Sequence, residues 1–422
     1  MLIQFNFKNF KSFREEATLD MTATRITENT NHVVEIGGER LLPAAAIYGA
    51  NASGKSNVVE AFRFMRTYVV NSFAYGDKDG DRKSQVRKPR RKPFLFDNDS
   101  MSTESAFEVY FIDSSDEHCK TINYGFCIDD DTVTEEWLNI KAKTAKNFKK
   151  IFHREGKEDI EFSGIAEIAK ESIKISLSDE SLIVSLGAKL QIPILKKVRD
   201  WFANLEFANY GDSGEDFFWS MSIPDGFATN ATIQNDVVSY LSTFDQSIKG
   251  FEVKKIPGDN DSTDRYKIYA IHDTANGKRV KIPLEEESAG TLKMFALYPS
   301  LNHVMRNGTV FVVDELDSKL HPLLVRNFIQ SFSNPKVNRH HAQIVFTTHD
   351  PWQLDNGSLR RDEIWMAEKS DDSTSSLYSL ADFGDESGTK IRKDENYEKN
   401  YLVGKYGGIP SLKSIDMLGE AD

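Results

Sequence analysis

The sequence predicts an α/β fold in which a mixed sheet is accompanied by an antiparallel β region and a helical insert. Residues 44–48 form a short uncharged apolar run, the glycine-rich segment 49–56 follows, and apolar residues then recur at helical spacing from Lys55 onward. Residues 310–313 form a second run of β-branched and aromatic residues, which ends in Asp314. Short runs of this kind are typical of buried parallel strands, and the helical spacing indicates a helix that packs on the sheet.

The composition allows two or three compact units and argues against several classes of protein. The chain has 422 residues, of which 39% are hydrophobic and 28% charged, which is enough for real cores. Its formal net charge of -12 disfavours a globally basic nucleic-acid-binding protein but allows a local basic face. Cys119 and Cys127 form no metal-binding pattern, and we expect both to be reduced. The amino terminus lacks the apolar core of a signal peptide, and no apolar run approaches the roughly 20 residues that span a bilayer. We therefore expect a soluble, cytoplasmic protein without a membrane contact.

The predicted elements fall into three parts. Strands at residues 2–7 and 17–21 form an opening hairpin, and an antiparallel region follows with strands at 106–112, 121–128, 132–141 and 148–153. Between residues 164 and 248 the apolar spacing becomes helical, and strand character returns at 251–256, 266–271 and 278–282. A helix at 291–301 and a strand at 343–347 belong to the last part. The expected domains are therefore residues 1–163, a helical insert at 164–248, and residues 249–422.

The segment 49–56, Gly-Ala-Asn-Ala-Ser-Gly-Lys-Ser, matches the pattern G-x-x-x-x-G-K-[ST]. A glycine loop that leads into a helix turns backbone N–H groups and the positive end of the helix dipole toward a phosphate. The Lys55 ammonium suits the outer phosphates of a nucleotide, and the Ser56 hydroxyl suits Mg²⁺. A glycine-rich turn without a ligand is the alternative, which the flanking elements and the distant motifs below disfavour. The predicted nucleotide contacts are Gly49, Asn51, Ser53, Gly54, Lys55, Ser56 and Asn57.

Two carboxylates, Asp314 and Glu315, end the second apolar run. They are expected at the carboxyl edge of a parallel strand, where nucleotides bind in open α/β sheets. Asp314 suits a magnesium ion held through water, and Glu315 suits the polarisation of an attacking water. The alternative is an acidic turn at a strand end.

Two further segments carry candidate residues. Ser288 and Gly290 stand where the helix at 291–301 should begin, and Ser288 on its own is a good helix cap. The functional alternative is a second helix N-terminus that contacts phosphate across a dimer interface. His349 follows the strand at 343–347 and is placed to touch a γ-phosphate or a lytic water, although a packed or capping histidine is the alternative there.

Seven lysine and arginine residues lie between Arg82 and Lys92. One interpretation is a solvated loop, and the other is a surface that contacts the phosphate backbone of DNA. No aromatic residue interrupts the run, so base stacking is not indicated there.

Together these motifs resemble those of the ABC-type ATPase heads of the SMC and double-strand-break-repair class. GANASGKSN resembles the Walker A loop, ESAGTLK a divergent signature motif, and TTHD the switch-histidine motif. VFVVDELDSKLHP resembles Walker B with Asp317 in the D-loop, and LIQFNFKNFKSF resembles the opening strand and turn of these heads. The signature departs from the usual pattern at Glu287 and Ala289. A closer likeness is to the compact bacterial ATPases related to the overcoming-lysogenisation-defect family, which include abortive-infection and other anti-phage proteins. YLVGKYGGIP, residues 401–410, looks like their C-terminal segment.

The resemblance implies that ATP and Mg²⁺ bind between two copies of the chain, in a homodimer or a higher even oligomer. Residues 49–56, Asp314, Glu315 and His349 would serve one ATP, and Ser288, Gly290 and Asp317 would complete the partner's site, with Lys55, Glu315 and His349 in catalytic roles. It implies a nucleotide-dependent switch that senses or controls a separately encoded effector, a nuclease or a toxin, in anti-phage defence. Only about 70 residues follow His349, so a nuclease module within this chain is not expected.

Two alternatives stay open. One is a repair or recombination ATPase of the SMC class that touches duplex DNA through the run between Arg82 and Lys92. The other is the ATPase of a small-molecule transporter, which the opening strands and the lack of a convincing Q-loop glutamine disfavour, because Gln85 lies within the basic run.

Overall fold

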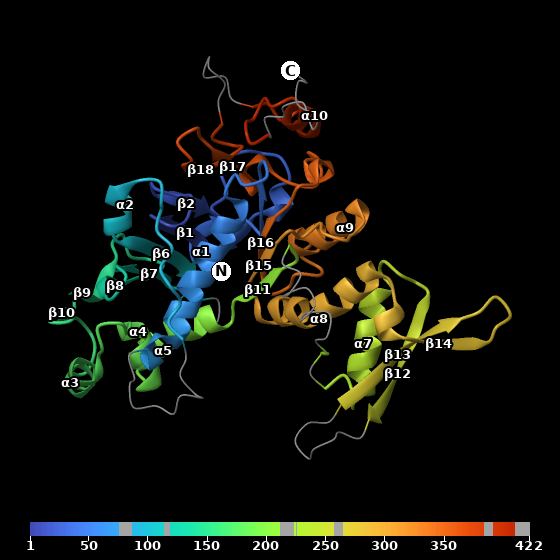
Figure 1. The fold of residues 1–422 in the computed structure, drawn as a ribbon, viewed down its shortest axis with the longest axis horizontal. Coiled ribbons are helices and arrows are strands. Elements are labelled where there is room, and N and C mark those ends of the chain that lie inside the picture. The colour runs from blue at the N-terminus through green and yellow to red at the C-terminus, as the bar shows by residue number, and fades with distance from the viewer. Residues whose placement is uncertain are drawn as a thin grey trace, which may run out of the picture. The chain divides into compact units, whose positions relative to one another are not determined.

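The computed structural model describes residues 1–75, 87–113, 119–211, 223–224, 226–256, 265–383 and 391–409. It contains two compact units, one made of Met1–Asn204 and Thr347–Asp422 and the other of Leu205–Phe346. Figure 1 shows that helices and sheets occur together in both units, which confirms the predicted mixed α/β class. Among these residues no helix has the length and the apolar character that crossing a membrane requires.

An antiparallel sheet of seven strands dominates the first unit. Its order is β10-β9-β8-β7-β6-β1-β2, so the predicted opening hairpin and the predicted antiparallel region are confirmed and belong to one sheet. Strand β10 was not predicted, although its sequence Asp-Ile-Glu-Phe alternates exposed polar and half-buried apolar residues. The strands are β1 (Leu2–Lys8), β2 (Ala17–Asp20), β6 (Ser105–Ile112), β7 (Thr121–Ile128), β8 (Val133–Lys141), β9 (Lys149–Glu155) and β10 (Asp159–Phe162).

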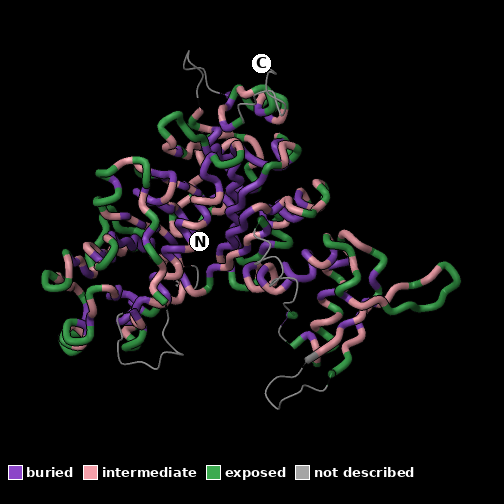
Figure 2. Tube along the Cα trace, in the orientation of Figure 1, coloured by how far each residue is buried: buried purple, intermediate pink, exposed green. Residues whose placement is uncertain are grey.

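Helix α1 (Lys55–Asn71) packs on this sheet and begins at the predicted residue. Its apolar residues Val58, Phe62 and Met65 are buried, and the Phe62 ring stacks on Phe5 of β1 with 4.5 Å between ring centroids. Strand β5 (Ala44–Tyr48), which leads into the glycine loop, is buried along its whole length, as the apolar run predicted. It pairs in parallel with β17 (Ile364–Lys369), and β17 pairs antiparallel with β18 (Ser375–Ser379). Figure 2 shows buried residues gathered in the interior of the first unit, while the last two residues of β17 are exposed.

The predicted helical insert is helical only in part. Helices α3 (Glu167–Ser176), α4 (Ile183–Lys189) and α5 (Pro193–Ala203) belong to the first unit, where Trp201 of α5 stacks on Phe111 of β6 at 4.1 Å. Glu206–Asn209 is instead a strand, β11, and it starts the second unit. The helical prediction is wrong there because these four residues pair in parallel with β15, and so short a segment carries no clear periodicity of its own.

The second unit combines a parallel and an antiparallel sheet. Strand β15 (Val310–Asp314) pairs in parallel with β11 and with β16 (Gln343–Thr347). The predicted strands that follow residue 248 form a separate antiparallel sheet of β12 (Ile248–Ile256), β13 (Arg265–Asp273) and β14 (Arg279–Pro283). The helices of this unit are α7 (Ala231–Leu241), α8 (Ala289–Asn307) and α9 (Pro322–Ser333). Further strands and α-helices of the first unit, within the described residues, are β3 (Val34–Ile36), β4 (Glu39–Leu41), α2 (Asn98–Ser102) and α10 (Tyr397–Leu402).

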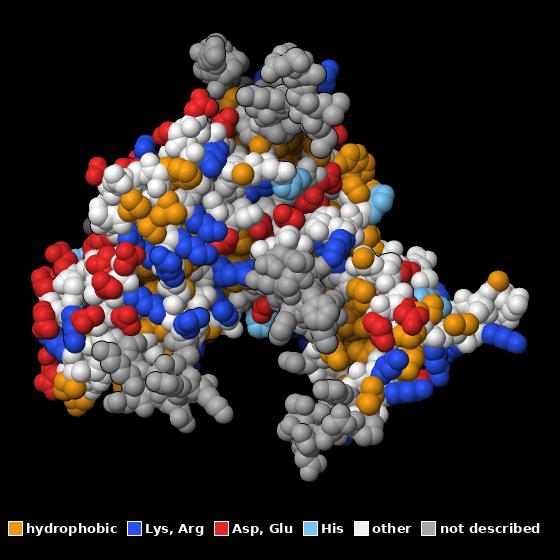
Figure 3. Space-filling view, viewed as in Figure 1, with side chains coloured by type: hydrophobic (Ala, Val, Ile, Leu, Met, Phe, Trp, Pro, Cys, Tyr) orange, Lys and Arg blue, Asp and Glu red, His pale blue; other side chains and the backbone are white. Residues whose placement is uncertain are grey.

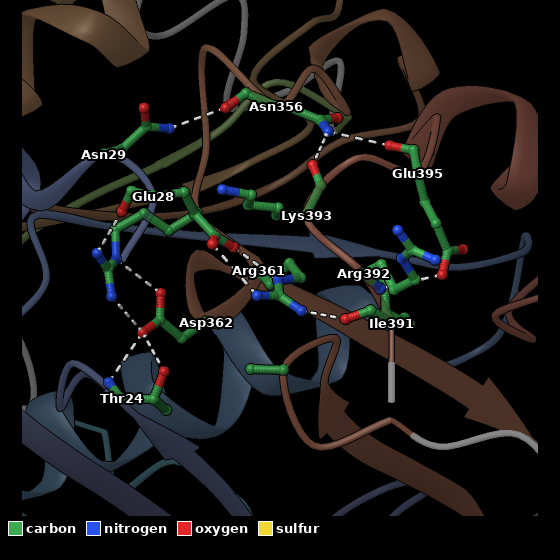
Figure 4. A network of polar contacts seen from close by, with 12 residues as sticks. Thr24, Glu28, Asn29, Asn356, Arg361, Asp362, Ile391, Arg392, Lys393 and Glu395 are labelled. Carbon is green, nitrogen blue, oxygen red and sulfur yellow. Dashed lines mark hydrogen bonds and ion pairs between the residues drawn. The ribbon is translucent and has the colours of Figure 1, made fainter. Parts of the chain in front are cut away.

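Both ends of the chain are tied together in the first unit (Figure 4). The Arg361 guanidinium donates to the Glu28 carboxylate, with Nε 2.6 Å from Oε1, and also to the backbone oxygen of Ile391. The Asn356 amide donates to the backbone oxygen of Lys393 at 2.6 Å. The Arg361–Glu28 bond joins residues 333 positions apart, and the bonds to Ile391 and Lys393 attach the segment that follows to the same network. This segment is therefore part of the first unit's structure.

A buried ion pair lies beneath the antiparallel sheet. The Glu136 carboxylate accepts the backbone N–H groups of Ile183 and Val184, at 2.7 and 3.1 Å, and the Tyr124 hydroxyl at 2.9 Å. The Arg154 guanidinium lies 3.2 Å from the same carboxylate, and both side chains are at most 1% exposed. One carboxylate therefore holds the start of α4 on strands β7, β8 and β9.

We expect Glu136→Gln to lower the free energy of unfolding by about 3–5 kcal/mol, because it leaves Arg154 without its counter-charge and turns one acceptor into a donor that faces N–H groups. Thermal and urea unfolding monitored by circular dichroism would measure the loss. Glu155→Gln, at an exposed position of β9, is the matched control and should change little. An equal stability of the two variants would contradict this assignment.

Candidate functional site

The glycine loop folds around its own lysine. The Lys55 side chain is buried, and its Nζ donates to the backbone oxygens of Gly49 and Ala50 at 2.8 and 2.9 Å. Gly49 (φ 152°), Ala52 (φ 64°) and Gly54 (φ 111°) have left-handed or related backbone conformations. Such residues turn successive N–H groups toward one point, which is the geometry of an anion-binding nest. Helix α1 starts at Lys55 behind Gly54, which supplies no side-chain cap, so its first turn also faces a ligand position.

The Ser53 hydroxyl fits a phosphate in this cradle. Its Oγ is buried and has no hydrogen-bond partner among the residues that the structure describes. Buried hydroxyls are normally paired, so Ser53 is suited to donate to an oxygen of a bound ligand. The fit also requires glycine at 49, because a Cβ there would lie 2.3 Å from the Ala367 oxygen and 2.5 Å from Ser53 Oγ.

Two serines that the sequence reasoning missed support the loop from outside. Ser375 Oγ lies 2.7 Å from the backbone oxygen of Ser53 and 2.7 Å from Ser12 Oγ. The Asn57 amide donates to Ser12 Oγ at 2.7 Å, so this predicted nucleotide contact points to the opening turn of the chain. Ser12 could have been found from the Phe-Lys-Ser-Phe turn, which the sequence analysis noted only as a resemblance. Nothing in the sequence around Ser375 indicates its role.

The C-terminal motif packs against the same loop. The ring of Tyr401 lies 5.7 Å from that of Tyr48, and its hydroxyl donates to the Gly408 oxygen at 3.4 Å. Burial raises the pKa of the Tyr401 phenol, and a hydrogen bond from the Gly49 N–H partly opposes the shift. A Cβ on Gly408 would lie 3.4 Å from the Gly49 Cα. The segment YLVGKYGGI, residues 401–409, thus packs against the strand and the first glycine of the loop. Pro410 lies outside the described residues.

His349 belongs to the same unit as the loop. The Thr348 N–H donates to the Ile47 oxygen at 3.2 Å, one residue before the end of β5. His349 therefore follows directly after a residue hydrogen-bonded to the strand that feeds the glycine loop, and its side chain is exposed. Its predicted role at the nucleotide stays a prediction.

The acidic strand end lies in the second unit. Asp314 is the buried last residue of β15, and its backbone oxygen accepts the Tyr210 N–H at 3.1 Å. Glu315 has a left-handed backbone with φ 54°, so the chain turns sharply after the strand. Its carboxylate lies against Gly211, where an added Cβ would come within 2.6 Å of Glu315 Cδ. The pair predicted for magnesium and water is thus held in one turn.

The signature-like turn shows the capping role that its sequence also allowed. Ser288 Oγ accepts the Thr291 N–H at 3.1 Å and caps α8. The preceding Glu287 carboxylate lies 2.7 Å from Nε2 of His272 on β13. A Cβ on Gly290 would come within 3.4 Å of the Lys319 oxygen, so this turn approaches the loop that contains Asp317.

No group of three or more His, Cys, Asp or Glu side chains suited to a metal occurs in the part of the chain that the structure describes. Magnesium in nucleotide sites is typically held by one or two protein oxygens and the substrate phosphates, so the roles predicted for Ser56 and Asp314 stay predictions. Ser56 belongs to the first unit and Asp314 to the second. Both Cys119 and Cys127 are free thiols, as expected.

Comparison with known proteins places the chain in a family. The family model described as "AAA domain, putative AbiEii toxin, Type IV TA system" matches residues 44–354. Among solved structures, the chain aligns with the Smc head domain with an extended coiled coil, bound to the C-terminal domain of ScpA, from Pyrococcus furiosus. That alignment has a TM-score of 0.41 and 12% sequence identity, and it covers 90% of this chain and 96% of that chain. No curated protein matches the sequence. The family model spans well over half of the chain, from the strand that precedes the glycine loop to beyond His349. The protein therefore belongs to this family of AAA-domain ATPases, whose description names the putative AbiEii toxin.

Proposed function

We propose that this protein is an ATP-hydrolysing switch in which two copies close around ATP and separate after hydrolysis, and that the switch controls a separately encoded nuclease or toxin in defence against phage. The observation that carries the proposal is the glycine loop. Its lysine is folded onto the loop carbonyls of Gly49 and Ala50, and the buried Ser53 hydroxyl has no partner among the described residues. A triphosphate would give the Ser53 hydroxyl a hydrogen-bond acceptor, and its anionic oxygens could replace the carbonyl oxygens as partners of the Lys55 ammonium.

The residues support a division of labour in hydrolysis. The N–H groups at the start of α1 and the Lys55 ammonium neutralise charge on the phosphates, which is the main source of catalysis in phosphoryl transfer. Glu315 orients the attacking water, and its tight packing against Gly211 limits the positions that its carboxylate can take. His349 contacts the γ-phosphate or that water.

Magnesium fits the oxygens that are present. The Ser56 hydroxyl and the Asp314 carboxylate would hold Mg²⁺, which neutralises phosphate charge when bound. Asp314 is suited to this role because its carboxylate is buried at a strand end, where a nearby cation lowers the cost of burying it.

The dimeric arrangement explains why one chain carries both a glycine loop and a signature-like turn. Ser288 and Gly290 would contact the nucleotide of the partner copy, and Asp317 would lie at the same interface. Loss of the γ-phosphate removes the group that both copies share, so the pair loosens. The family description names a putative toxin of a type IV toxin–antitoxin system, which supports a role in a toxin–antitoxin type of system.

The alternative of a DNA-contacting repair ATPase receives less support from the basic run. Arg82, Lys83 and Gln85 lie outside the described residues. Within the described part, Arg91 is buried and donates to Asp130, Thr103 and Met101, while Lys88 pairs with Glu180 and Lys92 with Glu60. Figure 3 shows lysine and arginine side chains gathered near helix α1. The ion pairs of Lys88, Arg91 and Lys92 with acidic side chains offset part of the positive charge of the run. Arg87 and Arg90 are exposed and are the positions at which a DNA contact should be tested.

We expect Glu315→Gln to bind ATP and accumulate as a closed dimer, because the water is no longer activated while the phosphate contacts are kept. Its hydrolysis rate should fall by about two to four orders of magnitude. Size-exclusion chromatography with light scattering and a phosphate-release assay would measure both effects. Lys55→Ala should instead lose ATP binding, and the exposed Glu155→Gln serves as the control. Wild-type turnover in Glu315→Gln would refute the catalytic role of Glu315.

We expect Arg91→Ala to destabilise the protein by about 2–4 kcal/mol, because the Met101 carbonyl oxygen and the Asp130 carboxylate lose their Arg91 donor and the Thr103 carbonyl keeps the Asn9 amide as its donor. Arg90→Ala, at the neighbouring exposed position, should leave stability unchanged. Thermal unfolding of the two variants would measure the difference. Neutralising Arg87 and Arg90 together then tests DNA contact cleanly, and a loss of salt-dependent duplex binding in that variant would favour the repair alternative.

A further inference from the structure

A buried lysine joins the signature-like helix to the loop that follows β15. Lys293 lies on α8, one turn after Ser288, and its side chain is buried. Its Nζ donates to the backbone oxygens of Leu316 at 2.9 Å and of Ser318 at 2.5 Å. The same ammonium lies 3.9 Å from the centroid of the Tyr210 ring, at cation–π distance. Three segments of the second unit therefore meet at one side chain.

The loop that Lys293 holds has a backbone that needs external support. Both Glu315 (φ 54°) and Lys319 (φ 60°) are left-handed residues that carry side chains. Such conformations are costly for residues other than glycine and persist only when their surroundings over-determine them. The ammonium binds carbonyl groups between these two residues, so it stabilises the shape of the turn itself.

The burial of the Lys293 ammonium lowers the stability of the protein unless its contacts compensate for the lost hydration. Burying an ammonium group carries a large desolvation penalty, and an apolar side chain of similar size often gives equal or greater stability. An apolar residue could fill the space, but it could not bind two carbonyl oxygens and the face of a tyrosine at once. The chemistry therefore indicates a role in placing the loop more than in strengthening the core.

The contacts of Lys293 surround Glu315. Leu316 follows Glu315 directly, and Ser318 Oγ and the Tyr210 oxygen approach each other at 3.5 Å. Tyr210 also donates its N–H to the Asp314 oxygen at 3.1 Å, and the next residue, Gly211, lies against the Glu315 carboxylate. The backbone on both sides of Glu315 is thus connected to Lys293, directly or through Tyr210.

Lys293 is also linked to the signature-like turn, because both lie at the start of helix α8. Helix α8 begins at Ala289 with the Ser288 cap, and a helix of this length transmits a displacement of its first turn to a side chain five residues on. Gly290 approaches the Lys319 oxygen on the same loop. A phosphate or a partner copy that shifts Ser288 and Gly290 would therefore move the Lys293 ammonium and the carbonyls it holds.

We propose that Lys293 is a positioning residue that couples the signature-like turn to Glu315, so that Glu315 is aligned for hydrolysis only when that turn is engaged. The inference rests on the proposed function and adds the residue that links its two half-sites. It predicts an effect on turnover and not on the binding of ATP, because the glycine loop that binds the phosphates lies in the other unit.

The test compares Lys293→Met with Lys293→Arg and Tyr210→Leu in the full-length protein. We expect Lys293→Met to lower kcat by about tenfold or more while the Kd for ATP changes by less than about twofold. Lys293→Arg should recover part of the rate, because a guanidinium keeps both charge and donors. Tyr210→Leu should lower kcat to an intermediate extent. Lys278→Met, at an exposed position of the β13–β14 turn, is the matched control and should behave as the wild type.

Amide hydrogen exchange of residues 315–320 without nucleotide provides a second measurement that does not depend on hydrolysis. Exchange should be faster in Lys293→Met than in the wild type. A wild-type kcat in Lys293→Met, or kcat and Kd that worsen together, would overturn the inference. If Lys293→Met does not fold, a wild-type kcat in Tyr210→Leu overturns it instead. If the wild type itself does not hydrolyse ATP, the proposed function fails, whereas unchanged exchange in the variant rejects the coupling alone.

Discussion

The glycine loop imposes the constraint on which the first unit depends. The chain must leave β5 and enter α1 while turning several N–H groups toward one point, and L-residues do this poorly. Gly49 and Gly54 relieve the backbone strain, and Lys55 binds the carbonyl oxygens of Gly49 and Ala50. These lysine bonds are exchangeable, because a phosphate can replace them. The loop is thus stable alone and still prepared for a ligand.

A second loop in the other unit meets the same problem in a different way. There the turn after β15 has left-handed residues at Glu315 and Lys319, and the Lys293 ammonium binds its carbonyls from a neighbouring helix. This lysine is deeply buried, and its partners are backbone atoms and a tyrosine ring. Lys55 thus stabilises a loop that is suited to bind a ligand, and Lys293 stabilises the backbone conformation of the turn after β15.

The distant ends of the chain are part of the first site. Ser12 near the start and Ser375 near the end hydrogen-bond to each other and to the loop. The C-terminal segment around Tyr401 packs behind Gly49. Because these supports approach from both termini, the loop geometry depends on the completed tertiary structure of the first unit and not on residues 49–56 alone.

The sequence by itself determined the elements and the chemistry. Uncharged apolar runs predicted β5 and β15, helical spacing predicted the start of α1 at Lys55, and the residue types at 49–56 indicated phosphate binding, because each of these properties is local to a few neighbouring residues. Tertiary structure alone decided which distant residues support those segments. Ser375, Tyr210 and Lys293 acquire their roles through contacts with partners 23 or more residues away, and no periodicity records such contacts. It also decided that the stretch around Ala208 is a strand, because pairing with β15 supplies the hydrogen bonds that its own four residues do not specify.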